Sequence, residues 1–126
     1  MKILFTLESS AGMEVKMKQS KGGVTAAKGF KAASTAAGIK YKDRTDMAMI
    51  YSEVPCAVAG TFTTNIVKAA PVKWDQHVVY DSKKAQAVIV NAGIANACTG
   101  EEGMGYCKAT AEKVNKLLQI PTDEVL

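Results

Sequence analysis

One stretch near the C-terminal end constrains the fold more than any other part of the sequence. Residues 85–90 (AQAVIV) form a short, largely apolar run, which is typical of a strand buried on both faces. The run leads into a loop of small and polar residues, NAGIANACTG, and a periodic apolar pattern follows the loop. Many α/β proteins build a ligand site from a strand, a glycine-containing loop and a helix in this order. We therefore expect a mixed α/β (α+β) fold.

The segment after this loop predicts the clearest helix. Its apolar side chains recur at steps of three and four residues: Met104, Cys107, Ala111, Val114 and Leu118. Lysine and glutamate side chains take the opposite face, and two glutamates near the start suit the positive end of the helix dipole. Pro121 lies just beyond the last of these positions, where helices commonly stop.

Weaker patterns predict further strands. Period-two alternation, β-branched residues or short apolar runs indicate strands at residues 3–7, 13–17, 47–52 and 58–64. Residues 124–126 begin another strand on the last positions of the sequence. We therefore expect the sequence to be cut inside a fold, with an incomplete sheet that exposes an edge.

Three segments have less definite patterns. Glycines and small residues between positions 22 and 40 favour extended backbone, with a helical turn at residues 32–37. Residues 67–72 are a short apolar run in which Pro71 forbids a central strand. Residues 77–80 suit a small strand or a helical turn.

Length and charge limit the class of protein. A chain of 126 residues with 48% hydrophobic residues suits a single domain or a domain fragment. The net charge is +4, and basic residues crowd the first third: Lys16, Lys18, Lys21, Lys28, Lys31, Lys40, Lys42 and Arg44. Such a cluster can bind phosphate or nucleic acid, but a solvated surface is the commoner explanation. We expect no nucleic-acid partner.

Cysteine and histidine usage excludes several kinds of site. Cys56, Cys98 and Cys107 are odd in number and lack CxxC spacing, which favours reduced, buried thiols over disulfides or zinc ligands. His77 is the only histidine, so a metal site or a Ser–His pair would have a single histidine side chain available. We expect no metal, and we expect Cys98 to be a small buried residue rather than a nucleophile.

The hydropathy of the sequence argues against a membrane-spanning protein. No apolar run approaches the length of a membrane span, and the run at residues 3–7 is too short for a signal peptide. We therefore expect a cytoplasmic protein with no membrane partner.

The loop after residues 85–90 allows two kinds of chemistry. Its glycines do not form GxGxxG or a phosphate-binding P-loop, and Glu101 and Glu102 would repel phosphate. Asn91, Asn96 and Thr99 can instead bind a small polar ligand such as an amino acid, or they can cap backbone groups of their own loop. Residue types alone favour the local hydrogen bonds, and the same choice holds at residues 63–65 (TTN).

Several segments taken together resemble one family. They are GGVTAAKGFKAA, DMAMIYSEVPCAVAGTFTTNIVKAAPV, AVIVNAGIANACTGEEG and CKATAEKV. In this order they resemble the ornithine acetyltransferase family, which includes the bifunctional glutamate N-acetyltransferase of arginine biosynthesis. The likeness covers residues 22–126. Ile66 and Ile94 depart from it, since the family often has a basic residue at the first position and commonly has asparagine at the second.

The resemblance implies an unusual enzyme with a layered α/β fold of its own type. Family members cut themselves at an Ala–Thr bond, and the freed threonine heads a β chain and acts as the nucleophile. Acetyl passes from N-acetylornithine to glutamate in a ping-pong cycle, and some members also use acetyl-CoA as a substrate. The α and β chains assemble into an (αβ)₂ heterotetramer, and we expect no bound cofactor.

This chain would be the N-terminal part of the α chain. The oxyanion donors, the catalytic lysine, the nucleophilic threonine and a downstream glutamate would all follow Leu126, so no catalytic residue is assigned within residues 1–126. We expect the chain alone to be inactive, and we expect Asn91, Asn96, Thr99 and Gly100 to wall the substrate pocket. The alternative is a non-catalytic binding or assembly module that retains this half of the fold.

Overall fold

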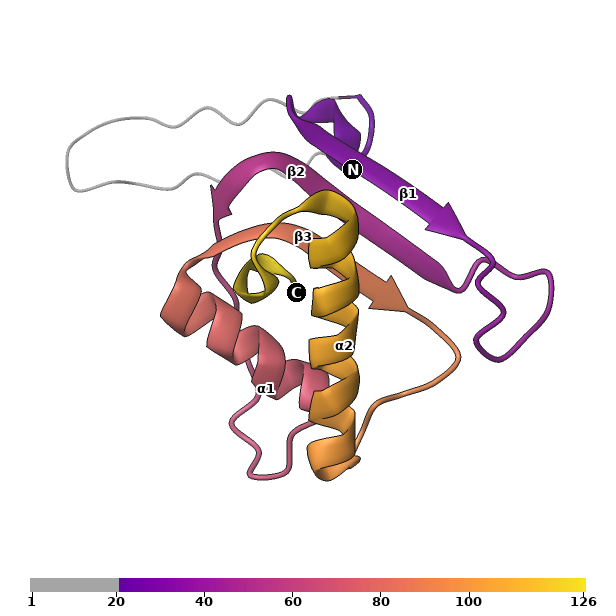
Figure 1. Ribbon diagram of the computed structural model, residues 1–126, viewed down its shortest axis with the longest axis vertical. Coiled ribbons are helices and arrows are strands. Elements are labelled where there is room, and N and C mark those ends of the chain that lie inside the picture. Colours follow the sequence, from indigo (N-terminus) through magenta and orange to yellow (C-terminus); the bar gives the residue numbers. More distant parts are fainter. Residues whose placement is uncertain (1–20) are drawn as a thin grey trace, which may run out of the picture.

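A computed structural model describes residues 21–126, so the strands predicted at residues 3–7 and 13–17 lie outside the described residues. Three strands, β1 (Phe30–Thr35), β2 (Met47–Ala57) and β3 (Lys84–Asn91), form one antiparallel sheet in the order β1-β2-β3. Two helices, α1 (Ala70–His77) and α2 (Gly100–Leu118), pack on one face of this sheet (Figure 1). The expected mixed α/β fold with an open sheet is confirmed.

The first hairpin is fixed by a buried aspartate. β1 pairs with β2 from Phe30 opposite Ser52 to Thr35 opposite Met47, so the helical turn predicted at residues 32–37 is mostly strand. The connection after Thr35 bends around Asp46, whose carboxylate accepts the backbone N–H groups of Ala37 and Ile39, both at 2.7 Å. Asp46 also accepts the N–H of the residue after β3 through its own carbonyl at 2.8 Å, which ties the hairpin to the loop that follows β3.

β2 is longer than its sequence pattern predicts. It continues through Pro55 to Ala57, and the register against β3 shifts between Tyr51 and Cys56. An irregularity of this kind accommodates a proline inside a strand. The separate strand predicted at residues 58–64 is absent from the described structure, because β3 begins at Lys84 opposite Ala57 and offers no partner beyond it.

The helix α1 occupies part of the short apolar run in which Pro71 was expected to forbid a central strand. Pro71 lies in the first turn of α1, where its fixed φ suits the helix and its missing N–H costs nothing. Residues 77–80 are helical, because α1 passes directly into a π-helical turn, η2 (Val78–Ser82), which ends at Lys83 with φ of 59°. The expectation that residues 67–72 form no central strand agrees with this helix, although the helix itself was not predicted.

The core lies between β3 and α2. It consists of Ala87, Ala111, Val114, Ile120 and Val125, with Tyr51, Trp74, Ile89 and Leu118 packed around it. The amphipathic helix is confirmed: Ala111, Val114 and Leu118 belong to this core or pack against it, Met104 and Cys107 are half-buried, and the charged positions are exposed. β3 is confirmed as a strand, but Val90 is 52% exposed, because helices cover only one face of the described sheet.

The last two residues pair with β3 in the parallel direction. After a 3-10 turn at Thr122–Glu124, Val125 forms a parallel bridge with Ala87 on the side of β3 away from β2. Leu126 donates its N–H to Ala87 at 2.9 Å and accepts that of Ile89 at 2.7 Å. The strand predicted at residues 124–126 thus begins one residue late. A largely apolar groove of about 570 Å³ remains open between α2 and strands β1 and β2.

Candidate functional site

The loop between β3 and α2 is held by its own side chains. Asn91 donates its side-chain N–H to the carbonyl of Ile94 at 3.1 Å, and Asn96 donates to the carbonyl of Gly103 in α2 at 3.0 Å. The Thr99 hydroxyl donates to the Asn96 side-chain oxygen. The local hydrogen bonds that the residue types favoured are therefore present, and they fix the loop against the first turn of α2.

Two left-handed residues turn the chain into α2. Cys98 and Gly100 both have φ of 56°, a conformation that glycine adopts readily and cysteine rarely. The Cys98 side chain is exposed, so its prediction as a small buried residue is wrong: the turn lies outside the packed interior. Cys56 and Cys107 are half-buried, and all three thiols are free.

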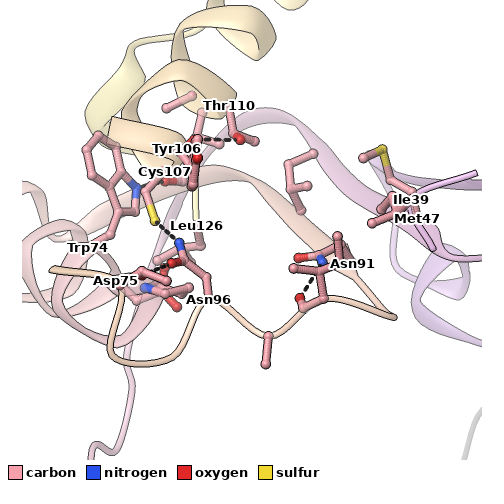
Figure 2. A pocket seen from close by; sticks show the side chains of 17 residues that line it. Ile39, Met47, Trp74, Asp75, Asn91, Asn96, Tyr106, Cys107, Thr110 and Leu126 are labelled. Carbon is pink, nitrogen blue, oxygen red and sulfur yellow. Dashed lines mark hydrogen bonds between the residues drawn. The ribbon is translucent and has the colours of Figure 1, made fainter. Parts of the chain in front are cut away.

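The loop forms one wall of a pocket of about 490 Å³ (Figure 2). Asn91, Asn96 and Thr99 line this pocket, whereas Gly100 is not among its lining residues. Figure 2 shows Asn96 at one side, together with Trp74, Asp75 and Cys107, and Asn91 at the other side. Elements that are distant in sequence thus meet here: α1, the β3–α2 loop, α2 and the C-terminal residues.

One carboxylate dominates the electrostatics of this pocket. Asp75 is half-buried, and loss of solvent raises the pKa of its carboxyl. Burial also raises the pKa of the Cys107 thiol, and the negative charge of Asp75 raises it further. The Asn96 side-chain amide lies 3.8 Å from the Cys107 sulfur. A thiol kept protonated in this way is a poor nucleophile, so the pocket is suited to binding rather than to thiol chemistry.

A long-range hydrogen bond joins two other parts of the pocket wall. The indole N–H of Trp74 donates to the carbonyl of Val125 at 2.8 Å, which joins α1 to the C-terminal residues. Leu126 lines the same pocket beside Ile89. Sequence reasoning missed Trp74 and Asp75 as pocket residues because it did not predict α1, and it assigned Cys107 only to the apolar face of the predicted helix. The available signal was Pro71 at the head of APVKWDQH.

The rest of the described surface shows no competing site of the kinds considered from sequence. Between residues 21 and 126 no group of three or more His, Cys, Asp or Glu side chains could hold a metal ion. The described members of the basic cluster are exposed: Lys21, Lys28, Lys31, Lys40, Lys42 and Arg44. Lys31 pairs with Glu53 at 2.6 Å, which raises the pKa of Lys31, and Lys40 and Arg44 flank the Tyr41 ring. In the same region, every helix is too short or too polar to cross a bilayer.

Comparison with known proteins agrees with the resemblance read from the sequence. The profile of the ArgJ family matches residues 31–126. The chain belongs to the ArgJ family. It is 49% identical over 110 residues to the chloroplastic arginine biosynthesis bifunctional protein ArgJ of Zea mays, covering 86% of this chain and 24% of that protein. It is also 49% identical over 105 residues to ArgJ of Gloeobacter violaceus, covering 83% of this chain and 26% of that protein.

Two solved ArgJ-family structures share the fold of this chain. The arginine biosynthesis bifunctional protein ArgJ of Bacillus halodurans aligns with a TM-score of 0.76 and 42% identity, over 82% of this chain and 54% of that one. Ornithine acetyltransferase of Mycobacterium tuberculosis, complexed with ornithine, aligns with a TM-score of 0.76 and 48% identity, over 82% of this chain and 56% of that one. The chain spans about a quarter of the length of the curated ArgJ relatives it matches.

Proposed function

We propose that the intact protein carrying these residues transfers acetyl from N-acetylornithine to glutamate in arginine biosynthesis. The observation that carries this proposal is the 49% identity to ArgJ bifunctional proteins over 110 residues. The match of residues 31–126 to the family includes the pocket-lining loop and all of α2. An ornithine-derived donor is supported by the M. tuberculosis neighbour, which was solved as a complex with ornithine.

We place the described residues in the pocket wall and the reacting groups elsewhere. His77, the only histidine of this sequence, is exposed, paired with Asp81 at 2.5 Å, and not among the residues that line the pocket. Cys107 is held protonated by burial and by Asp75. An acyl-threonine ping-pong reaction, with acetyl-CoA as a second donor, would take its nucleophile, lysine and oxyanion donors from the polypeptide that follows Leu126 in the intact enzyme.

The geometry at Leu126 supports this placement. Leu126 lines the pocket while it pairs with β3, so a strand continuing in the same direction would run along β3 beside the pocket. Backbone N–H groups at such a place can stabilise an oxyanion. We further propose that residues 1–126 belong to one domain of the α chain of a self-cleaving precursor, which assembles as (αβ)₂ in the cytoplasm.

A chimera tests the proposed function. Residues 31–126 would replace the matching segment of ArgJ from Thermotoga neapolitana, which is 49% identical to this chain over 100 residues. We expect the purified chimera to transfer acetyl from N-acetylornithine to glutamate. The 126-residue chain alone serves as the control and should show no turnover. A folded chimera without transfer, or an active isolated chain, would contradict the proposal.

Single alanine substitutions test the loop. In the chimera, Asn91, Asn96, Thr99 and Gly100 would each be changed to alanine. If the loop supports the pocket wall, the variants that break its hydrogen bonds should lower kcat/KM and thermal stability together. Wild-type kcat and KM in all four would show that the loop neither contacts substrate nor shapes the pocket.

A further inference from the structure

The C-terminal residues are held from two sides. On one side, Leu126 donates its N–H to the carbonyl of Ala87 at 2.9 Å and accepts the N–H of Ile89 at 2.7 Å. On the other side, the indole N–H of Trp74 donates to the carbonyl of Val125 at 2.8 Å. Successive residues of a strand direct their backbone groups to alternate sides, so this carbonyl faces away from β3. Trp74 therefore satisfies a backbone group that β3 cannot reach.

Both partners of the Trp74–Val125 hydrogen bond pack in or against the core. Val125 is 2% exposed and belongs to the core, and Trp74 packs against it. The donor lies in α1 and the acceptor follows 51 residues later, so the bond joins two segments that no local turn connects. Trp74, Val125 and Leu126 all line the pocket. The bond therefore helps to set the direction in which the backbone leaves residue 126 at the pocket wall.

Pairing with β3 alone leaves this direction open. Adjacent strands of a sheet twist relative to one another by about 10–35°, so hydrogen bonds on one side of a strand permit a range of directions. At about 3.3 Å per residue, a change of about 10° moves the backbone by about 1 Å after two residues. A second bond on the opposite side, such as the one from Trp74, narrows this range.

We propose that Trp74 is a positioning residue for acetyl transfer: its hydrogen bond to the Val125 carbonyl places the strand that continues from Leu126 in the intact enzyme. The inference rests on the proposed function, in which oxyanion donors follow Leu126. Such donors must lie about 2.7–3.1 Å from the oxyanion, and a misplacement of about 1 Å can lower a rate by about 100-fold. In this role Trp74 acts through the backbone of residue 125 and contacts no reacting atom.

Trp74→Phe in the chimera tests the proposal, because phenylalanine keeps an aromatic ring in α1 and lacks the N–H. We expect kcat to fall by about 10-fold to 100-fold while KM changes by less than about twofold, since oxyanion donors act on the transition state. The kcat is referred to the concentration of active sites, counted by mass spectrometry as enzyme acetylated by N-acetylornithine alone, so that a smaller folded fraction does not mimic the effect. Replacement of Trp74 by 3-benzothienylalanine, which has the shape of tryptophan with sulfur in place of the N–H, should give the same loss.

Gln86→Leu is the matched control. Gln86 also donates a side-chain N–H to a backbone carbonyl, that of Ser52 at 3.1 Å, and it does not line the pocket. Loss of this bond should leave kcat per active site unchanged. An equal fall of kcat in Gln86→Leu and Trp74→Phe would overturn the proposal, because the loss of any such hydrogen bond would then suffice.

Hydrogen exchange of the chimera, followed by mass spectrometry, reports the position of the strand without turnover. Trp74→Phe should speed exchange by about tenfold in peptides that contain residues 125 and 126, and it should leave peptides of β1 unchanged. An inactive unsubstituted chimera would contradict the proposed function, whereas the exchange rates would still decide whether Trp74 holds the strand. Unchanged exchange at residues 125 and 126, or unchanged kcat per active site in both Trp74 replacements, would overturn the proposal.

Discussion

Gly103 lies where α2 passes the first turn of α1, and a methyl group there has no room. A Cβ at this position would lie 2.9 Å from the Cβ of Ala70 and would collide with side-chain oxygens of Thr99 and Asn96. The Ala70 methyl group is buried and attached directly to the backbone of α1, so it cannot turn away. We predict that Gly103→Ala destabilises the protein although alanine favours helices.

The magnitude follows from opposing terms. Alanine in place of glycine at an open helix position stabilises by about 1 kcal/mol. Overpacking a close contact costs about 1–3 kcal/mol, and each hydrogen bond that Thr99 and Asn96 lose on moving costs about 1 kcal/mol more. The net expectation for Gly103→Ala is a loss of about 1–4 kcal/mol.

Gly105 provides a matched control two residues away. It lies in the same helix, it is exposed, and a Cβ there meets nothing within 4 Å. Gly105→Ala should therefore stabilise the protein by about 0.5–1 kcal/mol. Urea unfolding followed by far-UV circular dichroism measures both changes. Equal stabilisation by the two substitutions would refute the argument that α1 and α2 approach closely at Gly103.

Three further predictions concern single carboxylates and thiols. Asp46→Ala should cost about 2–4 kcal/mol of folding stability, since the buried carboxylate accepts two backbone N–H groups. The amides of Ala37 and Ile39 should then exchange hydrogen faster, and unchanged exchange would contradict the stabilising role of these two hydrogen bonds. Burial raises the pKa of Asp75 above 3.8, so the native state binds this proton more tightly than the unfolded state, and stability falls as pH rises through the native pKa. Asp75→Asn should therefore raise Tm at neutral pH with the gain vanishing below about pH 3.8, and a gain that persists there would contradict this cause. Iodoacetamide should alkylate exposed Cys98 before half-buried Cys107. Asp75→Asn should speed alkylation of Cys107, because loss of the neighbouring negative charge lowers the raised pKa of this thiol. Peptide mass spectrometry gives the rates, and an equal Cys107 rate in the wild type and in Asp75→Asn would argue that Asp75 does not raise this pKa.

The sequence predicted best where one residue pattern determined one element. The three- and four-residue spacing from Met104 to Leu118 defined the side of α2 that meets the core, and the apolar run before the loop gave β3. Strand propensity gave a wrong prediction where the fold provides no neighbouring strand for pairing. Residues 58–64 are rich in β-branched side chains, yet they form no strand because β3 does not extend beside them.

The pocket was less predictable than the fold because its parts come together only through α1. The loop residues Asn91, Asn96 and Thr99 were identified from their types, and all three line the pocket. Asp75 carried no signal in the sequence, because it reaches the pocket only as part of α1, which was not predicted. Pro71 was ambiguous, since a proline is compatible with both an edge strand and the first turn of a helix.

The hydrogen bond from Trp74 to the carbonyl of Val125 has a consequence for how the chain folds during synthesis. Val125 is 2% exposed, and it contributes both to the core and to the bridge beside β3. The β1–β2 hairpin can form from neighbouring sequence as soon as it leaves the ribosome. The interior between β3 and α2 can close only after residue 125 has emerged. Until then, the nascent chain presents its unpaired β3 edge and apolar helix face to chaperones.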